Sequence, residues 1–379
     1  MLKDKGSGLA LVGGGHAHLF VLEAMAQGRL RIPHTVLISP SRWQYYSGML
    51  PGLMAGHYRV EQCRIDLEQL ATRAGVRFIE QAVVSLDAEV QSLCLSGGGH
   101  LKYALASLDV GSETELGDLV GFQGRLIGVK PLDKFHADWL SFKDTLQRRG
   151  YGQLVVAGAG AAGVELAMAA AYALAAPGHG ARVTLVASEH GVLPGFASGV
   201  RKAVMRELTG LGVEIYTGGA AAQGNLIQVG RSTELHCDAL IAATGAKAPY
   251  WLRSSALRLD SEGFIEVDAN HRSLSHPNLF AVGDIASRPG SPLMRSGVHS
   301  VRAGPVLAHN LGVLMNGGRL QPFHPRAWVL YLISCGARRA VASWGPFAFA
   351  GDWVWRWKDR IDRGFIARFS SGGENSALL

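Results

Sequence analysis

Short apolar runs that end in glycine, each followed by a longer apolar run with helical spacing, recur along the chain. Residues 9–23 read LALVGGGHAHLFVLE, and residues 153–169 read QLVVAGAGAAGVELAMA. In each stretch the first run predicts a buried strand, the glycines predict a tight turn, and the remainder predicts a helix. Strands that alternate with helices in this way are typical of an α/β fold with parallel sheets.

The glycines of both turns have the spacing of a nucleotide-binding loop. The second turn has the full Gly-x-Gly-x-x-Gly spacing, with Gly158, Gly160 and Gly163. The first turn has Gly13 and Gly15, with His18 in the third place. Such glycines let the backbone approach a pyrophosphate, which lies at the positive N-terminus of the following helix. Two turns predict two dinucleotide sites, and the alternative is two ligand-free turns.

The strand after each predicted helix ends in serine. Residues 34–39 (HTVLIS) end in Ser39 and residues 182–188 (RVTLVAS) end in Ser188, where dinucleotide folds commonly place an acid that binds the ribose. A serine hydroxyl can hydrogen-bond a ribose but does not repel a 2′-phosphate. The choice between NADH and NADPH therefore stays open, with a weak preference for NADH from Glu189.

Composition fits a folded enzyme with more than one domain. The chain has 379 residues with 48% hydrophobic and only 18% charged residues, which is unlike a disordered protein. Its formal net charge of +7 allows attraction to anionic membranes, nucleotides or acidic partners without choosing among them. No zinc-finger spacing or RNA-binding aromatic signature accompanies this charge, so nucleic acid is not an expected partner.

The four cysteines indicate a reducing compartment. Cys63, Cys94, Cys237 and Cys335 lie far apart and form no Cys-x-x-Cys pair, so neither a disulfide framework nor a metal site is expected. The longest weakly charged stretch, residues 154–182, contains the second glycine turn and is interrupted by a glutamate and a proline, so it is not an expected membrane span. We expect a cytoplasmic protein.

Several segments resemble a known family of flavoproteins. Residues 42–58 read RWQYYSGMLPGLMAGHY and follow a strand, a glycine turn and a second strand. This order is similar to the two-dinucleotide flavoprotein reductases, especially the type II NADH dehydrogenases. With GGGHAH, RRAVASWGP and WRWKDRIDR, the chain most closely resembles the NADH dehydrogenase-like domain found fused to, or beside, selenide, water dikinase. A histidine at the position of His18 is usual there, and the resemblance covers nearly the whole chain.

The resemblance implies FAD and NAD(P)H as cofactors, bound by two Rossmann-like domains. It implies an FAD-binding domain in residues 1–115 and 253–318, an NAD(P)-binding domain in residues 116–252 and a small C-terminal domain in residues 319–379. The implied FAD site comprises Gly13, Gly15, His16, His18, Ser39, Arg42, Ser47, Pro51, Gly111, Lys130, Gly283, Asp284, Val298 and His299. The implied NAD(P) site comprises Gly158, Gly160, Gly163, Ser188 and Gly245.

Three features of the implied FAD site have expected roles. Gly283 and Asp284 resemble the second FAD signature of the family, in which the aspartate binds the ribityl chain. Residues 297–304 predict the start of a helix whose N-terminal amides face the flavin pyrimidine, with His299 contributing its backbone. Lys130 lies in a segment that resembles the hinge into the NAD(P) domain, and it either faces the flavin or is a solvated hinge residue.

Glu165 is the expected catalytic residue. It follows the third glycine of the second turn by two positions, which predicts a place in the first turn of the helix. The helix dipole alone could account for a carboxylate there. The resemblance instead implies that this glutamate lies where nicotinamide and flavin meet. In that position it would orient the nicotinamide, because hydride passes directly between the two rings.

Residues 352–369 predict a basic amphipathic helix near the C-terminus. Its large apolar residues recur every four positions, at Trp353, Trp357, Ile361, Phe365 and Phe369. The basic residues off this stripe are Arg356, Lys358, Arg360, Arg363 and Arg368. Such a helix either lies on an anionic membrane or packs on the protein's own core or a second subunit.

The expected function is transfer of hydride from NAD(P)H to FAD and then of electrons to an acceptor, with a quinone favoured by the resemblance. The expected location is the cytoplasm, or the inner face of the membrane as a peripheral protein. One alternative is a flavoprotein that oxidises sulfide or selenide, for which Cys335 is the candidate thiol. Another is a flavin-bearing accessory to selenophosphate synthesis that acts by contact with selenide, water dikinase.

Overall fold

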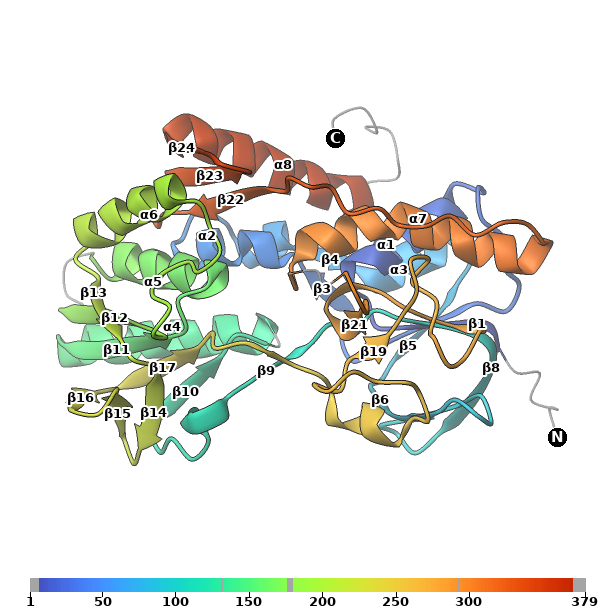
Figure 1. Ribbon diagram of the computed structural model, residues 1–379, viewed down its shortest axis with the longest axis horizontal. Coiled ribbons are helices and arrows are strands. Elements are labelled where there is room, and N and C mark those ends of the chain that lie inside the picture. Colours follow the sequence, from blue (N-terminus) through green and yellow to red (C-terminus); the bar gives the residue numbers. More distant parts are fainter. Residues whose placement is uncertain (1–6, 131, 176–179, 292–293, 371–379) are drawn as a thin grey trace.

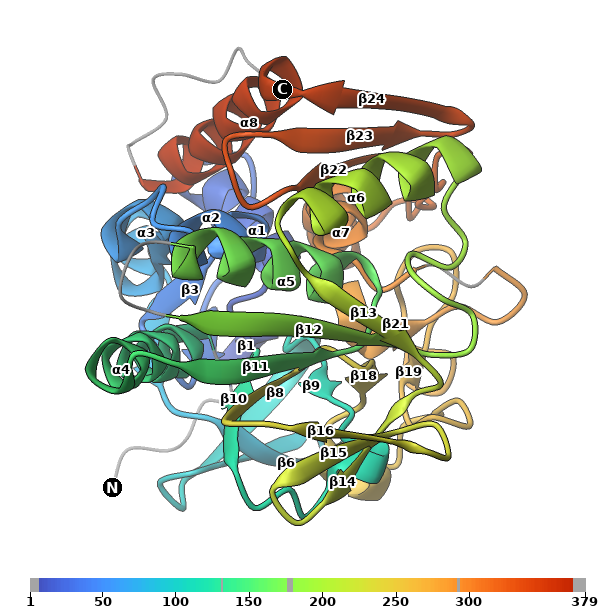
Figure 2. The ribbon, with the colours of Figure 1, turned by 90° about the vertical axis from the view of Figure 1, so that its left-hand side faces the viewer.

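The computed structural model describes residues 7–130, 132–175, 180–291 and 294–370. Two sheets built mainly of parallel strands lie side by side, each with helices on its faces (Figure 1). A small antiparallel sheet and the last helix lie across one side of both (Figures 1 and 2). This arrangement confirms the predicted α/β class with two Rossmann-like units and a small C-terminal unit.

The first sheet carries the first glycine turn. Its order is β5-β2-β1-β8-β7-β6, and β20 also pairs with β8. The pairs among β5, β2, β1, β8 and β20 are parallel, whereas β6, β7 and the start of β8 form an antiparallel meander. The strands are β1 (Ser7–Val12), β2 (Val36–Ser39), β5 (Arg77–Glu80), β6 (Val83–Asp87), β7 (Ser92–Leu95), β8 (His100–Leu108) and β20 (Leu279–Ala281).

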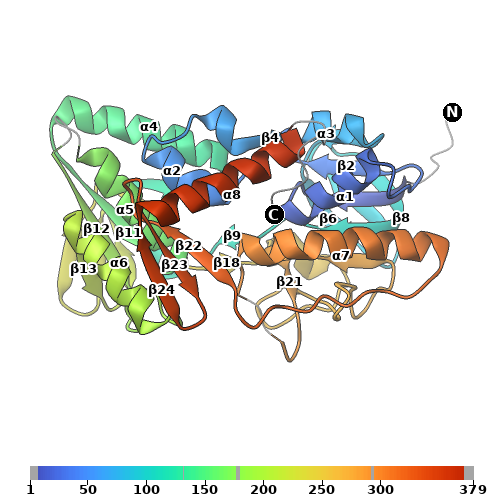
Figure 3. The same cartoon turned by 90° about the horizontal axis from the view of Figure 1, so that it is seen from above.

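Helices α1 (His16–Ala26) and α7 (Gly297–Asn316) pack side by side next to this sheet, as Figure 3 shows. They approach closely because Gly304 of α7 leaves room for the Phe20 ring of α1: a Cβ atom on Gly304 would lie 2.5 Å from Phe20 Cδ2. Helix α3 (Leu67–Arg73) also contacts α1, and its Leu67 and Leu70 are buried. These elements enclose one continuous apolar core.

The second sheet carries the second glycine turn. Its strands are all parallel in the order β10-β17-β11-β12-β13. They are β10 (Arg125–Gly128), β11 (Gly152–Ala157), β12 (Ala181–Ala187), β13 (Glu214–Thr217) and β17 (Ala239–Ala242). The accompanying helices are α4 (Leu132–Arg149), α5 (Ala161–Leu174) and α6 (Ser198–Gly210). A separate antiparallel sheet contains β14 (Ala220–Gln223), β15 (Leu226–Val229) and β16 (Thr233–His236).

Two crossing segments join the sheets. Strands β9 (Glu113–Thr114) and β18 (Ala246–Lys247) pair with each other, so the chain enters and leaves the second sheet through one narrow ribbon. Figure 1 shows this ribbon between the two larger units. The remaining short elements are β3 (Trp43–Tyr45), η1 (Ser47–Met49), α2 (Leu50–Met54), η2 (Val60–Cys63), β4 (Arg64–Asp66), η3 (Gly117–Leu119), η4 (Tyr250–Ser254), β19 (Ile265–Glu266), η5 (Gly283–Ile285) and β21 (Ala286–Ser287).

The C-terminal unit consists of the antiparallel strands β22 (Leu330–Ser334), β23 (Ala340–Trp344) and β24 (Phe347–Gly351), followed by α8 (Asp352–Ser370). The first half of α8 packs on β22 to β24, and its second half reaches the first sheet's helices (Figure 3). Arg368 at its end forms an ion pair with the buried Glu23 of α1. The predicted helix is therefore confirmed.

The predicted apolar stripe of α8 matches the buried face of the helix only in its C-terminal part. Phe365 and Phe369 are buried, but Trp353 and Trp357 are 50% and 40% exposed. Lys358, which the sequence placed off the stripe, is buried. The inward-facing residues are Val354, Lys358, Asp362, Phe365 and Phe369. The reason is geometric, because a strict four-residue repeat drifts by about 40° per step around an α-helix and over four steps leaves any single face.

We expect Phe365→Ala to destabilise the protein by about 3–5 kcal/mol, because Phe365 is buried against Phe20 and Tyr46. Trp353→Ala, on the same helix but half-exposed, is expected to cost less than about 1 kcal/mol. Urea unfolding followed by circular dichroism measures both. Equal losses for the two variants would contradict this assignment of the inner face.

Candidate functional site

The first glycine turn connects the end of β1 to α1. Gly13 has a φ of 91°, which a residue with a side chain rarely adopts, and its amide donates to Ile38 O at 2.8 Å. Gly15 is the N-cap residue of α1 and contributes no side-chain cap. The helix therefore begins with main-chain amides that no side chain of its own first turn covers, as an anion-binding site requires.

His18 supports this turn from behind. It is fully buried, with Nδ1 2.7 Å from Gly13 O and Nε2 2.8 Å from Ser107 Oγ. Because a carbonyl oxygen only accepts, Nδ1 donates to Gly13 and Nε2 accepts from the serine hydroxyl. Burial lowers the pKa of His18 to about 4, so the ring is neutral near pH 7. His18, which stands where the third glycine is usual, thus connects the turn at Gly13 to Ser107 of β8 through its two ring nitrogens.

Several predicted flavin-site residues converge at the N-termini of α1 and α7. The carbon Cε1 of His16 lies 3.4 Å from the position of a Cβ on Gly297, and Ser47 Oγ lies 3.8 Å from the same point. Val298 and His299 follow Gly297 in the first turn of α7, which contains no acid. Gly283 and Asp284 join Ser296 and His299 in the lining of a cavity of about 210 Å³.

This region contains buried polar atoms that have no hydrogen-bond partner among the residues that the structure describes. They are His16 Nε2, Ser296 Oγ, His299 Nδ1 and Ser300 Oγ. Burial lowers the pKa of His16 to about 4 and also lowers the pKa of His299, so both rings are neutral near pH 7. Buried polar atoms normally have hydrogen-bond partners. A polar cofactor that offers both donors and acceptors, as a flavin ring and its ribityl chain do, fits this set.

Lys130 lies beside the same site. Its Nζ donates to Ser112 O at 3.0 Å and to Ser112 Oγ at 3.1 Å, and lies 3.6 Å from Asp284 Oδ2. A Cβ on Gly111, whose φ is 69°, would lie 4.0 Å from this nitrogen. Lys130 is half-exposed but is paired with Asp284 rather than freely solvated. It therefore joins the hinge to the expected ribityl-binding acid.

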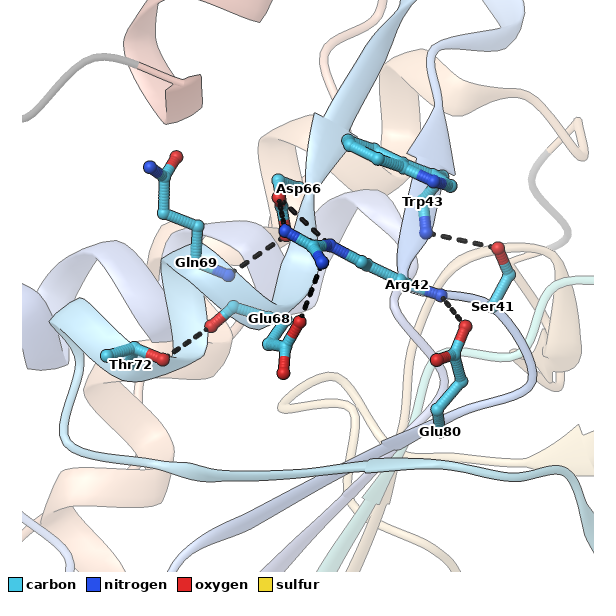
Figure 4. Close-up of polar contacts among 8 residues, drawn as sticks. All are labelled: Ser41, Arg42, Trp43, Asp66, Glu68, Gln69, Thr72 and Glu80. Carbon is cyan, nitrogen blue, oxygen red and sulfur yellow. Dashed lines mark hydrogen bonds and ion pairs between the residues drawn. The ribbon is translucent and has the colours of Figure 1, made fainter.

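Ser39 and Arg42 are engaged by the protein itself. Figure 4 shows the Arg42 guanidinium between Asp66 and Glu68: Nε lies 3.0 Å from each Asp66 oxygen, and Nη1 lies 3.0 Å from Glu68 Oε2. The buried Ser39 donates its hydroxyl to the backbone at Ser41. These contacts hold the turn that leads to β3. Pro51 is buried within α2, so its predicted flavin contact stays a prediction.

The second glycine turn is more open than the first. Gly158 has a φ of 103°, and a Cβ on Gly163 would overlap the Gly158 carbonyl, so α5 and the strand end are in direct contact there. Gly160 is exposed, and a Cβ on it would meet no atom within 4 Å. Ser188 follows β12 and is exposed, and Gly245 follows β17 with a φ of 158°.

Glu165 lies in the second turn of α5, so its predicted place in the first turn is wrong. The helix begins at Ala161, and its first turn contains no acid. Glu165 Oε1 instead accepts a hydrogen bond from the Ser334 amide of β22 at 2.7 Å. Burial raises the pKa of Glu165 to about 7, while the charge of Lys358 opposes that rise. Helix capping therefore does not account for this residue.

Sequence reasoning missed a cluster of polar side chains around Glu165, which we call the junction cluster: Tyr46, Glu165, Lys358 and Asp362. Lys358 Nζ donates to Asp362 Oδ2 and to Gly48 O, both at 2.6 Å. The Tyr46 hydroxyl hydrogen-bonds Asp362, and its ring stacks on Phe365 with centroids 4.4 Å apart. Burial raises the pKa of Asp362. The cluster joins all three structural units, and the four-residue spacing of Lys358 and Asp362 was its only sequence signal.

Three of the four thiols, those of Cys63, Cys237 and Cys335, are buried and poorly suited to redox chemistry. Cys335 Sγ donates to Ile333 O at 3.5 Å, and burial raises its pKa. Burial also raises the pKa of Cys63 and of Cys237 to about 12. Among the residues that the structure describes, no three His, Cys, Asp or Glu side chains are grouped to hold a metal. Within the same ranges, every helix is too short or too polar to cross a bilayer.

Two nucleotide turns on two Rossmann-like sheets, with a polar site between them, define a two-nucleotide oxidoreductase fold. The chain matches the pyridine nucleotide-disulphide oxidoreductase family over residues 8–305 and belongs to that family. This membership confirms the expected family, one of oxidoreductases that use a pyridine nucleotide.

Relatives in sequence cover only part of the chain. Dihydrolipoyl dehydrogenase of Haloferax volcanii is 26% identical over 243 residues, which is 60% of this chain and 47% of that protein. A type II NADH:quinone oxidoreductase of Mycobacterium tuberculosis is 26% identical over 296 residues, 70% of this chain and 60% of the relative. The chain thus spans less than two thirds of the length of either relative.

Solved structures extend the likeness in fold to nearly the full chain. The sulfide:quinone oxidoreductase of Aquifex aeolicus superimposes with a TM-score of 0.81, 14% identity and coverage of 98% of this chain and 93% of the other. NDH2 of Plasmodium falciparum, solved in complex with NADH, superimposes with a TM-score of 0.80 and 14% identity. The match covers 97% of this chain and 99% of the other. At this identity the likeness establishes the fold and leaves the substrates open.

We expect Gly160→Ala to weaken NAD(P)H binding by about tenfold or more while leaving the fold intact, because its new Cβ meets only the space that a pyrophosphate would enter. Gly163→Ala is the matched contrast, since its Cβ overlaps the Gly158 carbonyl and should lower the thermal midpoint. Nucleotide titration and thermal melting separate the two effects. A Gly160→Ala protein that binds NAD(P)H normally would contradict this location of the pyrophosphate.

Proposed function

We propose that this protein oxidises NAD(P)H through bound FAD and passes the electrons to a quinone. The observation that carries the proposal is the junction of the three units. Glu165 of α5, Tyr46 of the loop after β3 and Lys358 of α8 lie close together beside the N-termini of α1 and α7, where we propose that the flavin binds. One relative, from Mycobacterium tuberculosis, is itself a type II NADH:quinone oxidoreductase.

The residues present fit FAD, with the polar chain of the cofactor beside Asp284 and Lys130 and its ring system near His16 and the start of α7. FAD, when bound, supplies a ring that accepts hydride and releases electrons. The first amides of α7 and the positive end of its dipole stabilise negative charge on the pyrimidine side of that ring. His16 is neutral near pH 7, and its buried Nε2, which has no partner among the described residues, is available to hydrogen-bond the cofactor.

Glu165 is the proposed catalytic residue, and its role is to position the nicotinamide. Its carboxyl group is held in one orientation by hydrogen bonds from the amide and the side chain of Ser334, which fixes it as a contact for the nicotinamide. Burial raises the pKa of Glu165 to about 7, so its neutral form is favoured more than in an exposed glutamate.

The structure favours this proposal over sulfide or selenide oxidation. That chemistry needs a thiolate next to the flavin, but Cys335 is buried and burial raises its pKa. The partnership with selenide, water dikinase stays a prediction that none of the comparisons supports. A role in selenium metabolism likewise stays a prediction.

The decisive experiment is an anaerobic titration of the purified protein. We expect a yellow protein that releases FAD on denaturation, whose flavin is bleached by NADH or NADPH and recoloured by a quinone but not reduced by sulfide. Glu165→Gln should retain FAD and the Ser334 hydrogen bond but should reduce flavin at least about tenfold more slowly. A colourless protein that cannot take up FAD, or flavin reduction only by sulfide, would refute the proposed function.

We further propose peripheral membrane contact through an exposed aromatic surface on the C-terminal unit: Trp328, Trp344, Phe347, Phe349, Trp353 and Trp357, each roughly half-exposed. Three of these rings contact one another around Trp328, with centroids 5.7 and 6.1 Å from it. The exposed Arg356 and Arg360 lie on the same helix as the last two. Aromatic rings beside basic residues suit the interface of an anionic bilayer.

The test is flotation with vesicles of neutral and anionic lipid at low and high salt. Because α8 is part of the core, the test uses point substitutions and not a protein that lacks this helix. Trp344→Ala/Phe347→Ala/Trp353→Ala should lower binding by about a hundredfold, at roughly 1 kcal/mol for each partly buried ring. Tyr250→Ala, an exposed aromatic residue of η4, is the control. If the intact protein does not float under any condition, the membrane proposal fails.

A further inference from the structure

Asp109, directly after β8, is a buried acid at the base of the first glycine turn, and it is only 3% exposed. Its Oδ2 accepts from the amides of Ala17 at 2.8 Å and His18 at 3.2 Å, the second and third residues of α1. Its backbone carbonyl accepts from the Gly15 amide at 3.1 Å. Asp109 therefore caps α1 from inside the protein, in place of the side-chain cap that Gly15 lacks.

The same carboxyl group determines how much room the turn has. A Cβ on Gly15 would overlap it, so only glycine fits there. Its Oδ1 lies 2.8 Å from the position of a Cβ on Gly283, and Ser300 Oγ lies 3.1 Å from that point. Ser300 is 4% exposed, and its hydroxyl has no hydrogen-bond partner in the described part of the chain. The acid and the unpartnered hydroxyl thus line one side of the space at Gly283, where a bound cofactor would complete the contacts.

We propose that Asp109 is a positioning residue for the FAD pyrophosphate: it holds the inner amides of α1, so that the cofactor binds at the outer ones, and it takes up a proton when the cofactor binds. This inference rests on the proposed function only in taking FAD as the ligand. The physical reason for the proton is charge. A doubly negative pyrophosphate next to a buried carboxylate, with Asp284 also close by, would concentrate like charges in a region of low dielectric.

The groups that face Asp109 leave it as the one expected to titrate near neutrality. Burial raises its pKa to about 7, the hydrogen bonds from His18 and Ala17 oppose the rise, and Asp284 adds to it. On α1, burial lowers the pKa of His16 and of His18 to about 4, so both stay neutral.

The remaining neighbours lie on other elements. From α7, Ser300 does not titrate and burial lowers the pKa of His299, so that ring also stays neutral near pH 7. The hinge residue Lys130 is paired with Asp284.

The direction of the pH dependence follows. Binding a negative ligand raises the pKa of Asp109 further above its value of about 7 in the free protein. At pH values between the two, the bound state then holds up to one more proton than the free state. FAD affinity should therefore be highest below pH 7 and should fall as pH rises above it, by at most about tenfold per pH unit.

The experiment measures the dissociation constant of FAD for the full-length protein stripped of flavin, from pH 6 to pH 9, by quenching of flavin fluorescence. Asp109→Asn keeps an oxygen that accepts the two α1 amides but cannot titrate, so its affinity should be almost independent of pH. Asp87→Asn is the matched control, because Asp87 is an exposed acid that accepts the Val90 amide far from the glycine turn. Its pH profile should equal that of the wild type.

Proton uptake gives a second readout that does not depend on the variant folding. Calorimetry of FAD binding to the wild type at pH 8, in two buffers of different ionisation enthalpy, should show uptake of close to one proton. No uptake, or an Asp109→Asn protein with the wild-type pH slope, would overturn the inference while leaving the proposed function intact. Failure of the wild type to bind FAD at any pH would instead refute the proposed function.

Discussion

Both nucleotide turns depend on one backbone constraint: a parallel strand must turn into a helix without a side chain of the turn itself covering the first amides of that helix. Gly13 and Gly158 meet the constraint with φ values of 91° and 103°, a region that costs residues with side chains about 1–2 kcal/mol. The turns differ in how the third place is filled. Gly163 allows α5 to contact the Gly158 carbonyl directly, whereas His18 bonds the Gly13 carbonyl with its ring. The second turn thus reaches this geometry because Gly163 has no side chain, and the first turn reaches it because the His18 ring hydrogen-bonds the Gly13 carbonyl.

The C-terminal unit completes the site because α8 carries its own buried charge pair into it. Lys358 and Asp362 lie on the inner face of the helix, and Lys358 also holds the backbone of Gly48. A buried ion pair recovers little more than its desolvation cost, but loss of one partner is expensive, commonly about 3–5 kcal/mol. The pair therefore favours one position of α8 relative to the loop that contains Gly48. Glu165 adds a second tie to the same unit through the Ser334 amide.

The sequence was sufficient for the fold class and for the two glycine turns, because a short apolar run followed by glycine and a helical pattern is a local signal. It was insufficient where distant segments meet. The wrong turn for Glu165 came from counting from a glycine that lies inside the helix, after its true start at Ala161. The role of His18 depends on Ser107, 89 residues away, and Asp109 acts on α1 across a similar separation. Such pairings leave no periodic pattern in the chain.

Helix α8 also connects the aromatic surface to the junction cluster. Trp353 lies on the aromatic surface, whereas Phe365, twelve positions later, stacks on Tyr46 at the junction cluster. At 1.5 Å per residue this separation is about 18 Å along the helix axis. Under the proposed function, the head group of a quinone whose apolar tail stays in lipid would have to cross this distance to reach the junction cluster. Helix α8 spans that distance, so it would fix the junction cluster relative to the proposed membrane surface.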